Sequence, residues 1–484
     1  MRKALSLMAV FAHLMLPAAA QLPEARRTRL LRQMDDTAAH YGELSRRIWE
    51  FAEVGYKETR SSALLRDELK ANGFRIEQNV GGIPTAFVAT WGSGAAPVIA
   101  LLGEFDALPE LSQDTVAERK PRVHGGAGHG CGHNLFGAAV AFAAITAKNY
   151  MVAEKLAGTI RFYGTPAEEG GGGKVYMARA GAFQGVDVAL TWHPGPENSA
   201  ALATSLANIN AKFKFRGIAS HAAGAPWNGR SALDGVLLMN HALDMMREHV
   251  PTETRIHYII TKGGAAPNVV PEFAETYVYA RHPRMSVLDG IWARIIKTAE
   301  GAALATETRM EMEIVNSVWD VLPNDALGAL LQKNLELVGG VKYSPEERVF
   351  AERLRATFVD PAGLPPLGQE ETILPPAQVR GGGGSTDVGD ISWQLPTAQF
   401  NASTWAPGTS FHTWQATAFS GMSIGRKGMV VAAKTLALAT LDILHDPSHV
   451  QRAREAFDRR RAGFTYRSRV PASQGAPLHY RDTQ

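Results

Sequence analysis

Three features that each mark a particular class of protein are scarce in the sequence: cysteine, excess charge of one sign and long apolar runs. It contains one cysteine, Cys131, so no disulfide can form within the chain. Its 50 basic and 47 acidic residues give a net charge of +3, which is too small an excess to indicate a nucleic-acid surface. After the N-terminal region no stretch reaches ~18 uninterrupted apolar residues, the length that a membrane span needs. These absences argue against a disulfide scaffold, a nucleic-acid-binding protein and an integral membrane protein.

The sequence contains enough apolar residues to form a large hydrophobic core. Hydrophobic residues make up 45% and charged residues 20% of the 484 residues, a composition typical of globular proteins. At roughly 100–200 residues per domain, this length predicts two or three domains, or one large domain with an insertion. Either arrangement leaves room for a cleft between domains.

The first 20 residues have the layout of a secretory signal peptide. Arg2 and Lys3 precede an apolar run over residues 4–16, and three alanines at 18–20 form a small-residue exit. The run is too short for a permanent anchor. We therefore expect an exported protein, periplasmic or secreted. The alternative is an apolar N-terminal helix that is retained, in a cytoplasmic protein.

Alternating strand and helix patterns predict an α/β fold on both sides of the middle of the chain. Strand-like runs occupy residues 85–91, 98–102, 159–163 and 186–191, with helical patterns between them. Such alternation favours a parallel sheet with its ligand site at the carboxyl ends of the strands. We assign residues 21–206 and 319–464 to this catalytic domain, and expect a loosely ordered polar tail over 465–484.

Between these halves, residues 207–318 follow a different order. Strand, helix, two strands, helix and strand are predicted at 209–215, 231–248, 256–261, 275–281, 288–304 and 306–314. This β-α-β-β-α-β order is that of a ferredoxin-like unit. We interpret it as an inserted domain because the α/β pattern resumes after it.

The strongest local signal is the run Gly-His-Gly-Cys-Gly-His-Asn at residues 128–134. Glycines allow the tight bend that would bring Cys131 and His133 to one point, and thiolate and imidazole are good zinc ligands. Two alternatives remain open. Cys131 could be an inert buried thiol, or a nucleophile with His133 or His193 as its base.

Further polar residues follow predicted strands. Glu168 and Glu169 come directly after the strand at 159–163, so one carboxylate could bind a metal while the other carries protons. His193 follows the strand at 186–191, and His412 lies in a later Phe-His-Thr-Trp run. An exposed acidic pair and packed histidines are the ordinary alternatives. With Cys131 and His133, these side chains would supply five ligands, enough for two metals.

Several blocks, in order along the chain, resemble one family. They are residues 103–109 (Gly-Glu-Phe-Asp-Ala-Leu-Pro), the Cys-Gly-His element, residues 220–223, 264–271 and 384–390. The chain resembles the aminoacylase/carboxypeptidase family of dinuclear metallohydrolases over about residues 30 to 445, within the cysteine-containing amidohydrolase subgroup. The resemblance implies a zinc-peptidase-like catalytic domain with an inserted ferredoxin-like lid and dimerisation domain.

The resemblance also assigns roles to residues of the site. It implies two divalent ions, zinc or manganese, and Glu168 as the general base. Asp106 would orient a metal ligand or Glu168. Many family members have histidine at the position of Glu104, a departure that fits the cysteine-containing subgroup. The implied metal ligands are Cys131, His133, Glu169, His193 and His412.

Residues of the insertion would complete the site. The resemblance implies that His221 reaches the active site of a partner subunit and holds the scissile carbonyl oxygen, which requires a homodimer. Asn268 and Arg281 match positions that contact the substrate carboxylate, a group that an arginine fork binds bidentately. A second, homologous subunit is a further possible partner. No stable membrane anchor or nucleic-acid partner is expected.

The expected activity is metal-dependent hydrolysis of the amide bond of N-acyl amino acids, with p-aminobenzoyl-glutamate as the first expected substrate. A metallo-exopeptidase acting on short peptides and a hydrolase dependent on Cys131 are the alternatives. A metal-loaded protein without catalysis is a third, but the presence of Glu168 beside Glu169 argues against it.

Overall fold

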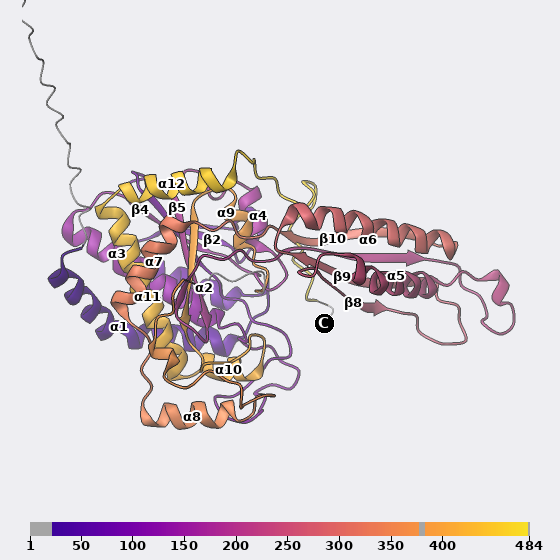
Figure 1. Cartoon of the computed structure of the whole chain (residues 1–484), viewed down its shortest axis with the longest axis horizontal. Coiled ribbons are helices and arrows are strands. Elements are labelled where there is room, and N and C mark those ends of the chain that lie inside the picture. Colours follow the sequence, from indigo (N-terminus) through magenta and orange to yellow (C-terminus); the bar gives the residue numbers. More distant parts are fainter. Residues whose placement is uncertain (1–21, 377–382, 483–484) are drawn as a thin grey trace, which may run out of the picture.

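The computed structural model describes residues 22–376 and 383–482. The predicted signal peptide lies outside the described residues. The described chain has two parts, a large α/β body and a smaller unit that projects from it (Figure 1). This arrangement confirms the α/β fold class with an inserted β-α-β-β-α-β unit.

The body is built on a seven-stranded sheet with the order β1-β2-β4-β3-β5-β11-β6. Strands β4, β3, β5 and β11 are parallel neighbours, while β1, β2 and β6 pair antiparallel at the two edges. The central strands are buried apolar runs, as expected for a parallel sheet covered on both faces. The strands are β1 Arg75–Gln78, β2 Phe87–Gly92, β3 Val98–Gly103, β4 Thr159–Gly164, β5 Val188–Gly195, β6 Ser199–Ala201 and β11 Thr397–Ser403.

Helices cover both faces of this sheet. One face packs against a large core that includes α1 (Glu24–Phe51), α2 (Thr59–Ala71), α3 (His133–Glu154), α7 (Asp325–Val338) and α11 (Ser423–His445). The other face packs against α4 (Gly173–Arg179) and α9 (Val388–Ser392). The body also carries α8 (Pro345–Arg355), α10 (Trp414–Ser420), α12 (Ser448–Arg461) and short 3-10 turns at Val80–Gly82 and Gln369–Glu371.

Two of these helices are apolar enough to span a bilayer by length and composition. They are α3 and α11, but 78% and 83% of their most apolar windows are buried inside the protein. Both lie in the large core of the body. Their apolar character is therefore explained by packing within the protein.

The projecting unit is an antiparallel four-stranded sheet with the order β10-β7-β9-β8. Two helices, α5 (Ala232–Met246) and α6 (Met285–Ala305), pack on one face through a separate core. This is the strand order of a ferredoxin-like unit, and each predicted element is present within a few residues. The strands are β7 Ala207–Arg216, β8 Arg255–Lys262, β9 Phe273–His282 and β10 Arg309–Val318, with 3-10 turns at Pro226–Asn228 and Arg247–His249.

The polar C-terminal residues are packed against the rest of the protein, contrary to the loose tail that their composition predicts. Val470 is buried, and the indole nitrogen of Trp319 donates to the carbonyl of Arg467 over 3.0 Å. Gln474 donates to the carbonyl of Ile314 over 2.7 Å. Composition misled here because backbone carbonyls and a few apolar contacts hold the segment.

Candidate functional site

The predicted site residues come from the carboxyl edge of the parallel sheet, where open α/β sheets place their ligand sites. Asp106 follows the end of β3, and Glu168 and Glu169 follow the end of β4. His193 lies near the end of β5, and His412 lies between β11 and α10. Neighbouring parallel strands therefore bring together residues that are far apart in sequence.

The Cys-Gly-His element forms the turn that begins α3. Gly132 caps the helix with a φ of 73°, a left-handed conformation that favours glycine. A Cβ at this position would lie 2.8 Å from the Cβ of Pro194. The turn thus needs glycine both for its backbone angle and for its close approach to β5, and it places Cys131 and His133 on the same side.

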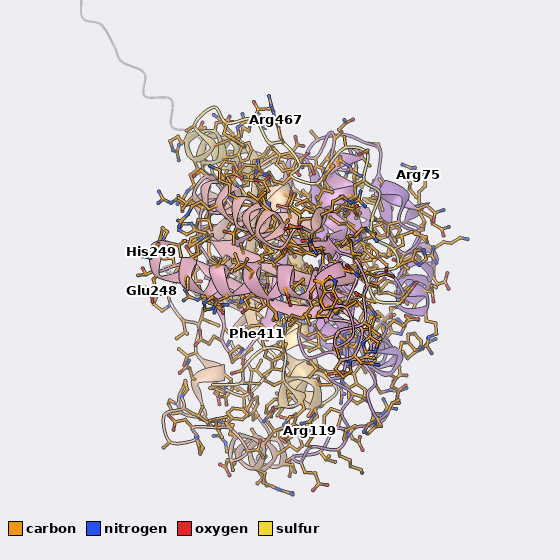
Figure 2. All side chains as sticks on the ribbon, turned by 90° about the vertical axis from the view of Figure 1, so that its right-hand side faces the viewer. Arg75, Arg119, Glu248, His249, Phe411 and Arg467 are labelled. Atoms are coloured by element: carbon orange, nitrogen blue, oxygen red, sulfur yellow. The ribbon has the colours of Figure 1, made fainter. Side chains whose placement is uncertain are left out.

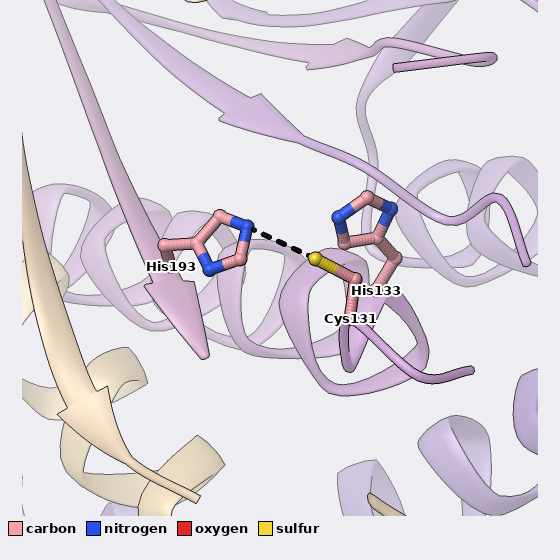
Figure 3. Close-up of side chains that lie close together, drawn as sticks. All are labelled: Cys131, His133 and His193. Atoms are coloured by element: carbon pink, nitrogen blue, oxygen red, sulfur yellow. Dashed lines mark hydrogen bonds between the residues drawn. The ribbon is translucent and has the colours of Figure 1, made fainter. Parts of the chain in front are cut away.

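Among the residues that the structure describes, three groups of side chains have ligand atoms within 4.8 Å of one another, close enough to share a metal ion. Cys131 takes part in the first two groups. Its Sγ lies 3.6 Å from Nε2 of His193, and the rings of His133 and His193 stand nearly perpendicular. Figure 3 marks the contact between Cys131 and His193 with a dashed line. The groups are Cys131–His133–His193, Cys131–Glu169–His412 and Glu104–His133–Glu168.

Buried polar atoms without hydrogen bonds support a cation at this place. Oε2 of Glu104, Nε2 of His133 and Oε1 of Glu169 are all buried, and none makes a well-formed hydrogen bond. Nε2 of His412 lies 3.2 Å from Oε1 of Glu169. Leaving several buried polar atoms unsatisfied is costly, and divalent cations would satisfy them. The donor set of thiol, imidazole and carboxylate suits zinc or a similar metal.

The histidine rings are oriented for metal binding by their other nitrogens. Nδ1 of His133 lies 2.9 Å from Oδ1 of Asp106, and Nδ1 of His193 lies 2.7 Å from the carbonyl of Pro194. Each contact favours a proton on Nδ1 and leaves a lone pair on Nε2. Asp106, which the sequence predicts to orient a metal ligand or Glu168, lies beside the candidate ligand His133.

The two adjacent glutamates have different electrostatic environments. Burial, together with the charges of Glu104 and Glu169, raises the pKa of Glu168 well above its usual range. Burial also acts to raise the pKa of Glu169, but the close contact and charge of His412 outweigh it and lower that pKa to about 2. One carboxyl is thus suited to carry a proton and the other to stay ionised, which is the pattern of an acid/base residue beside a ligand.

Sequence reasoning missed a buried lysine behind the site. Nζ of Lys174 lies 2.6 Å from Oε1 of Glu104 and 2.7 Å from Oδ1 of Asp387, and all three residues are buried. The second oxygen of Glu104 lies 3.2 Å from Nε2 of His133. Glu104 thus contacts the candidate ligand His133 with one oxygen and the buried Lys174–Asp387 ion pair with the other. A lysine after a glycine run carries no signal that it is buried, so this role was not predictable.

The loop that carries Glu168 and Glu169 is fixed through its backbone. The amide of Ala167 donates to Glu58 over 2.8 Å, and the amide of Glu169 donates to Asp106 over 2.9 Å. Ala167 has a φ of 56°, a conformation that a non-glycine residue keeps only when its surroundings hold it. Glu58 is not predictable from the sequence as part of the site, because no residue near it suggests chemistry.

The residues from the insertion are not all brought to this site within one chain. His221 and Asn268 lie in adjacent loops, where the amide of Ala222 donates to the carbonyl of Asn268. Both loops are at the end of the projecting unit away from the body, a strand length of roughly 30 Å from its base. Arg281 is near the base, with its guanidinium over the ring of Tyr279.

An aromatic side chain lies beside the candidate ligands. Phe411 is 46% exposed, and its ring centroid is 5.6 Å from that of His193 and 4.9 Å from that of Trp405. In Figure 2, where the projecting unit points toward the viewer, Phe411 appears just below that unit. It is an apolar surface at the edge of the site.

One protein family and several known proteins are similar to this chain. Residues 100–357 match the model of peptidase family M20/M25/M40. The chain is 40% identical to one of the subunits of p-aminobenzoyl-glutamate hydrolase of Escherichia coli over 86% of this chain and 91% of that protein. It is 32% identical to the Xaa-Arg dipeptidase of Mus musculus, over 91% and 94% of the two chains. A solved dinuclear metal-binding M20 peptidase of Bacillus subtilis has the same fold, with a TM-score of 0.56 and 16% identity over 85% of this chain and 99% of that chain.

Proposed function

The chain belongs to peptidase family M20/M25/M40, and on that basis we propose that it is a metal-dependent amidohydrolase that cleaves N-acyl amino acids. The observation that carries the proposal is the convergence of five candidate ligands beside Glu168 at the edge of the sheet. The residues proposed to hold two divalent ions, zinc or manganese, are Cys131, His133, Glu169, His193 and His412.

In the proposed reaction, bound divalent ions would supply Lewis-acid polarisation of the amide carbonyl and a lower pKa of the attacking water. Glu168 accepts the proton from that water and later passes it to the nitrogen of the leaving amine. Asp106 keeps the ring of His133 in the tautomer that leaves Nε2 unprotonated. His221, from a partner subunit, donates a hydrogen bond to the oxyanion as the carbonyl carbon becomes tetrahedral.

The proposed substrates have an aromatic acyl group and an acidic amino acid. The exposed ring of Phe411 offers a stacking surface for an aromatic acyl group beside His193. Arg281 offers a guanidinium for a carboxylate. The similarity to a protein named as part of p-aminobenzoyl-glutamate hydrolase supports p-aminobenzoyl-glutamate as the first substrate to test.

A substrate panel tests this specificity. The purified protein is assayed with p-aminobenzoyl-glutamate, with N-acetyl-glutamate and with dipeptides that end in arginine. We expect the highest kcat/KM with the aromatic acyl-glutamate. A preference for the dipeptides would favour the alternative of a short-peptide exopeptidase, which the similarity to an Xaa-Arg dipeptidase supports.

We also propose that the protein forms a homodimer through the projecting unit, whose inferred role is that of a lid and dimerisation domain. Its edge strand β8 exposes Ile259 and Ile260, and helix α5 exposes Leu237 and Met245. Exposed apolar side chains next to an open strand edge are typical of an association surface. Such a dimer would carry His221 and Asn268 toward the partner subunit's site.

Subunit mixing tests the action of His221 across the dimer. His221→Ala and Glu168→Gln are each expected to be nearly inactive alone. Because a mixed dimer contains one site with both native residues, mixing and reassociating the two variants should restore about a quarter of the wild-type activity. The measurement is the hydrolysis rate before and after reassociation. No recovery, with mixed dimers demonstrated by a tag on one variant, would contradict action across the dimer.

Two further proposals concern assembly and location. The Escherichia coli hydrolase has two differently named subunits that are both similar to this chain, which supports a possible homologous second subunit here as well.

The layout of the first 20 residues supports export, to the periplasm or the medium. N-terminal sequencing of the protein recovered from its native compartment tests the second point, because retention of Met1 would contradict cleavage of a signal peptide.

A further inference from the structure

The C-terminal segment, defined here as residues 464–482, connects the two parts of the molecule. It leaves α12 and crosses the junction between the body and the projecting unit, in yellow in Figure 1. On the projecting unit, Gln474 donates to Ile314 in β10 over 2.7 Å, and Arg469 pairs with Asp289 in α6. On the body, Arg179 in α4 donates to the carbonyl of Pro471 over 2.8 Å. The segment is thus anchored on both sides of the junction.

The end of this segment reaches the loop that carries the two adjacent glutamates. The hydroxyl of Tyr480 donates to the carbonyl of Glu169 over 3.0 Å, and Nη2 of Arg481 donates to the same oxygen over 2.7 Å. The ring of Tyr480 packs edge-on against Tyr56, which itself donates to the carbonyl of Gly171 over 2.7 Å. Two donors from the segment therefore converge on one backbone oxygen of a candidate metal ligand.

The opposite side of this loop is held by the body. The amide of Glu169 donates to Asp106, and the next residue, Gly170, has a φ of 95°. The peptides on either side of Glu169 are thus fixed by groups from different parts of the chain. A Cβ on Gly170 would lie within 4.0 Å of Tyr279, Tyr480 and Arg481, so the segment end fills the space between the loop and strand β9.

We propose that the C-terminal segment is a positioning element of the active site. Tyr480 and Arg481 hold the carbonyl of Glu169 and thereby set the directions of the Glu168 and Glu169 carboxyl groups. Because the same segment is attached to the projecting unit, the geometry of the site depends on how that unit is seated against the body. The expected effect of the segment on kcat rests on the proposed function. The expected effect of the segment on metal affinity can be measured without a substrate.

The test compares point variants of the segment. Tyr480→Phe removes the hydroxyl and keeps the ring on Tyr56, and Arg481→Met removes the guanidinium. The double variant should lose about 10- to 100-fold in kcat and in affinity for Zn²⁺ or Mn²⁺, as expected when a group that orients a ligand is lost. KM should change by less than about threefold. A double variant with Arg481→Lys in place of Arg481→Met keeps a hydrogen-bond donor at this position. It should therefore lose less kcat and less metal affinity.

Two controls separate positioning from simple stability. His479→Ala changes an exposed neighbour that contacts Asp482 and not the loop, so it should leave kcat and metal affinity unchanged. A chain that ends at Gln474 keeps the contacts to Ile314 and Arg179 but lacks the end of the segment, and it should behave like the double variant.

The outcomes are distinct. A lower Tm with unchanged kcat and unchanged metal affinity in the double variant would overturn the proposal. The segment would then contribute only to the stability of the fold. If the wild type hydrolyses none of the amides tested, the proposed function fails. In that case metal titration of the same variants, followed by calorimetry, still decides whether the segment positions the site.

Discussion

Replacing Glu168 by Gln is expected to lower kcat for amide hydrolysis by about 10²–10⁴-fold, the range that a general base contributes. Glutamine has nearly the same shape but cannot accept the proton of the attacking water. Glu168 is the member of the pair whose pKa is raised, first by burial and then by the charges of Glu104 and Glu169. The loss should therefore appear in kcat, with metal content and Tm close to those of the wild type.

The control for this variant is Glu371→Gln, which changes an exposed carboxyl far along the chain from the site loop. It should keep kcat within about twofold. The measurement is a steady-state assay with p-aminobenzoyl-glutamate, with bound metal quantified in the same samples. A Glu168→Gln variant that retains metal and more than half of the wild-type kcat would show that another group moves the proton.

Replacing Lys174 by Met is expected to destabilise the protein by about 3–5 kcal/mol, the usual cost of removing one partner from a buried ion pair. Lys174 is fully buried between Glu104 and Asp387, and its amide also donates to Asp387. Methionine fills similar space but would leave two buried carboxylates without their cation. Chemical denaturation of the metal-free protein measures the change in the free energy of unfolding.

The matched control is Lys297→Met, at an exposed position of α6, which should change the free energy of unfolding by less than about 0.5 kcal/mol. The double variant Lys174→Met/Glu104→Gln should recover part of the loss, since it removes one of the uncompensated charges. A Lys174→Met variant within about 1 kcal/mol of the wild type would mean that the carboxyl groups take up protons at little cost.

Much of the fold was predictable because its signals are local. The strands of the central sheet are short apolar runs, and the two helices of the projecting unit have clear amphipathic patterns that begin near Ser231 and Arg284. The convergence of Cys131, Glu169 and His193 followed from a general property of parallel sheets, whose carboxyl ends share one edge. For these features, local sequence patterns and the general topology of parallel sheets were sufficient to predict the structure.

What the sequence could not predict depends on contacts between distant segments. Lys174 appears as an ordinary charged residue, and only the fold shows that it is buried between two carboxyls. The segment that contains Tyr480 is polar, and its order comes from single contacts to backbone carbonyls in both parts of the molecule. His221 lies at the tip of the projecting unit, and its proposed role depends on a partner copy of the chain, which sequence patterns do not reveal. Such features carry no periodic signal.

The most direct test of the central claim is a metal titration of activity. The purified protein is treated with a chelator, its metal content is measured, and hydrolysis of p-aminobenzoyl-glutamate is followed as Zn²⁺ or Mn²⁺ is added back. We predict that chelation abolishes hydrolysis and that activity returns as bound metal rises to about two ions per chain. Full activity in the metal-free protein, abolished by alkylation of Cys131, would contradict the dinuclear mechanism and make Cys131 the nucleophile.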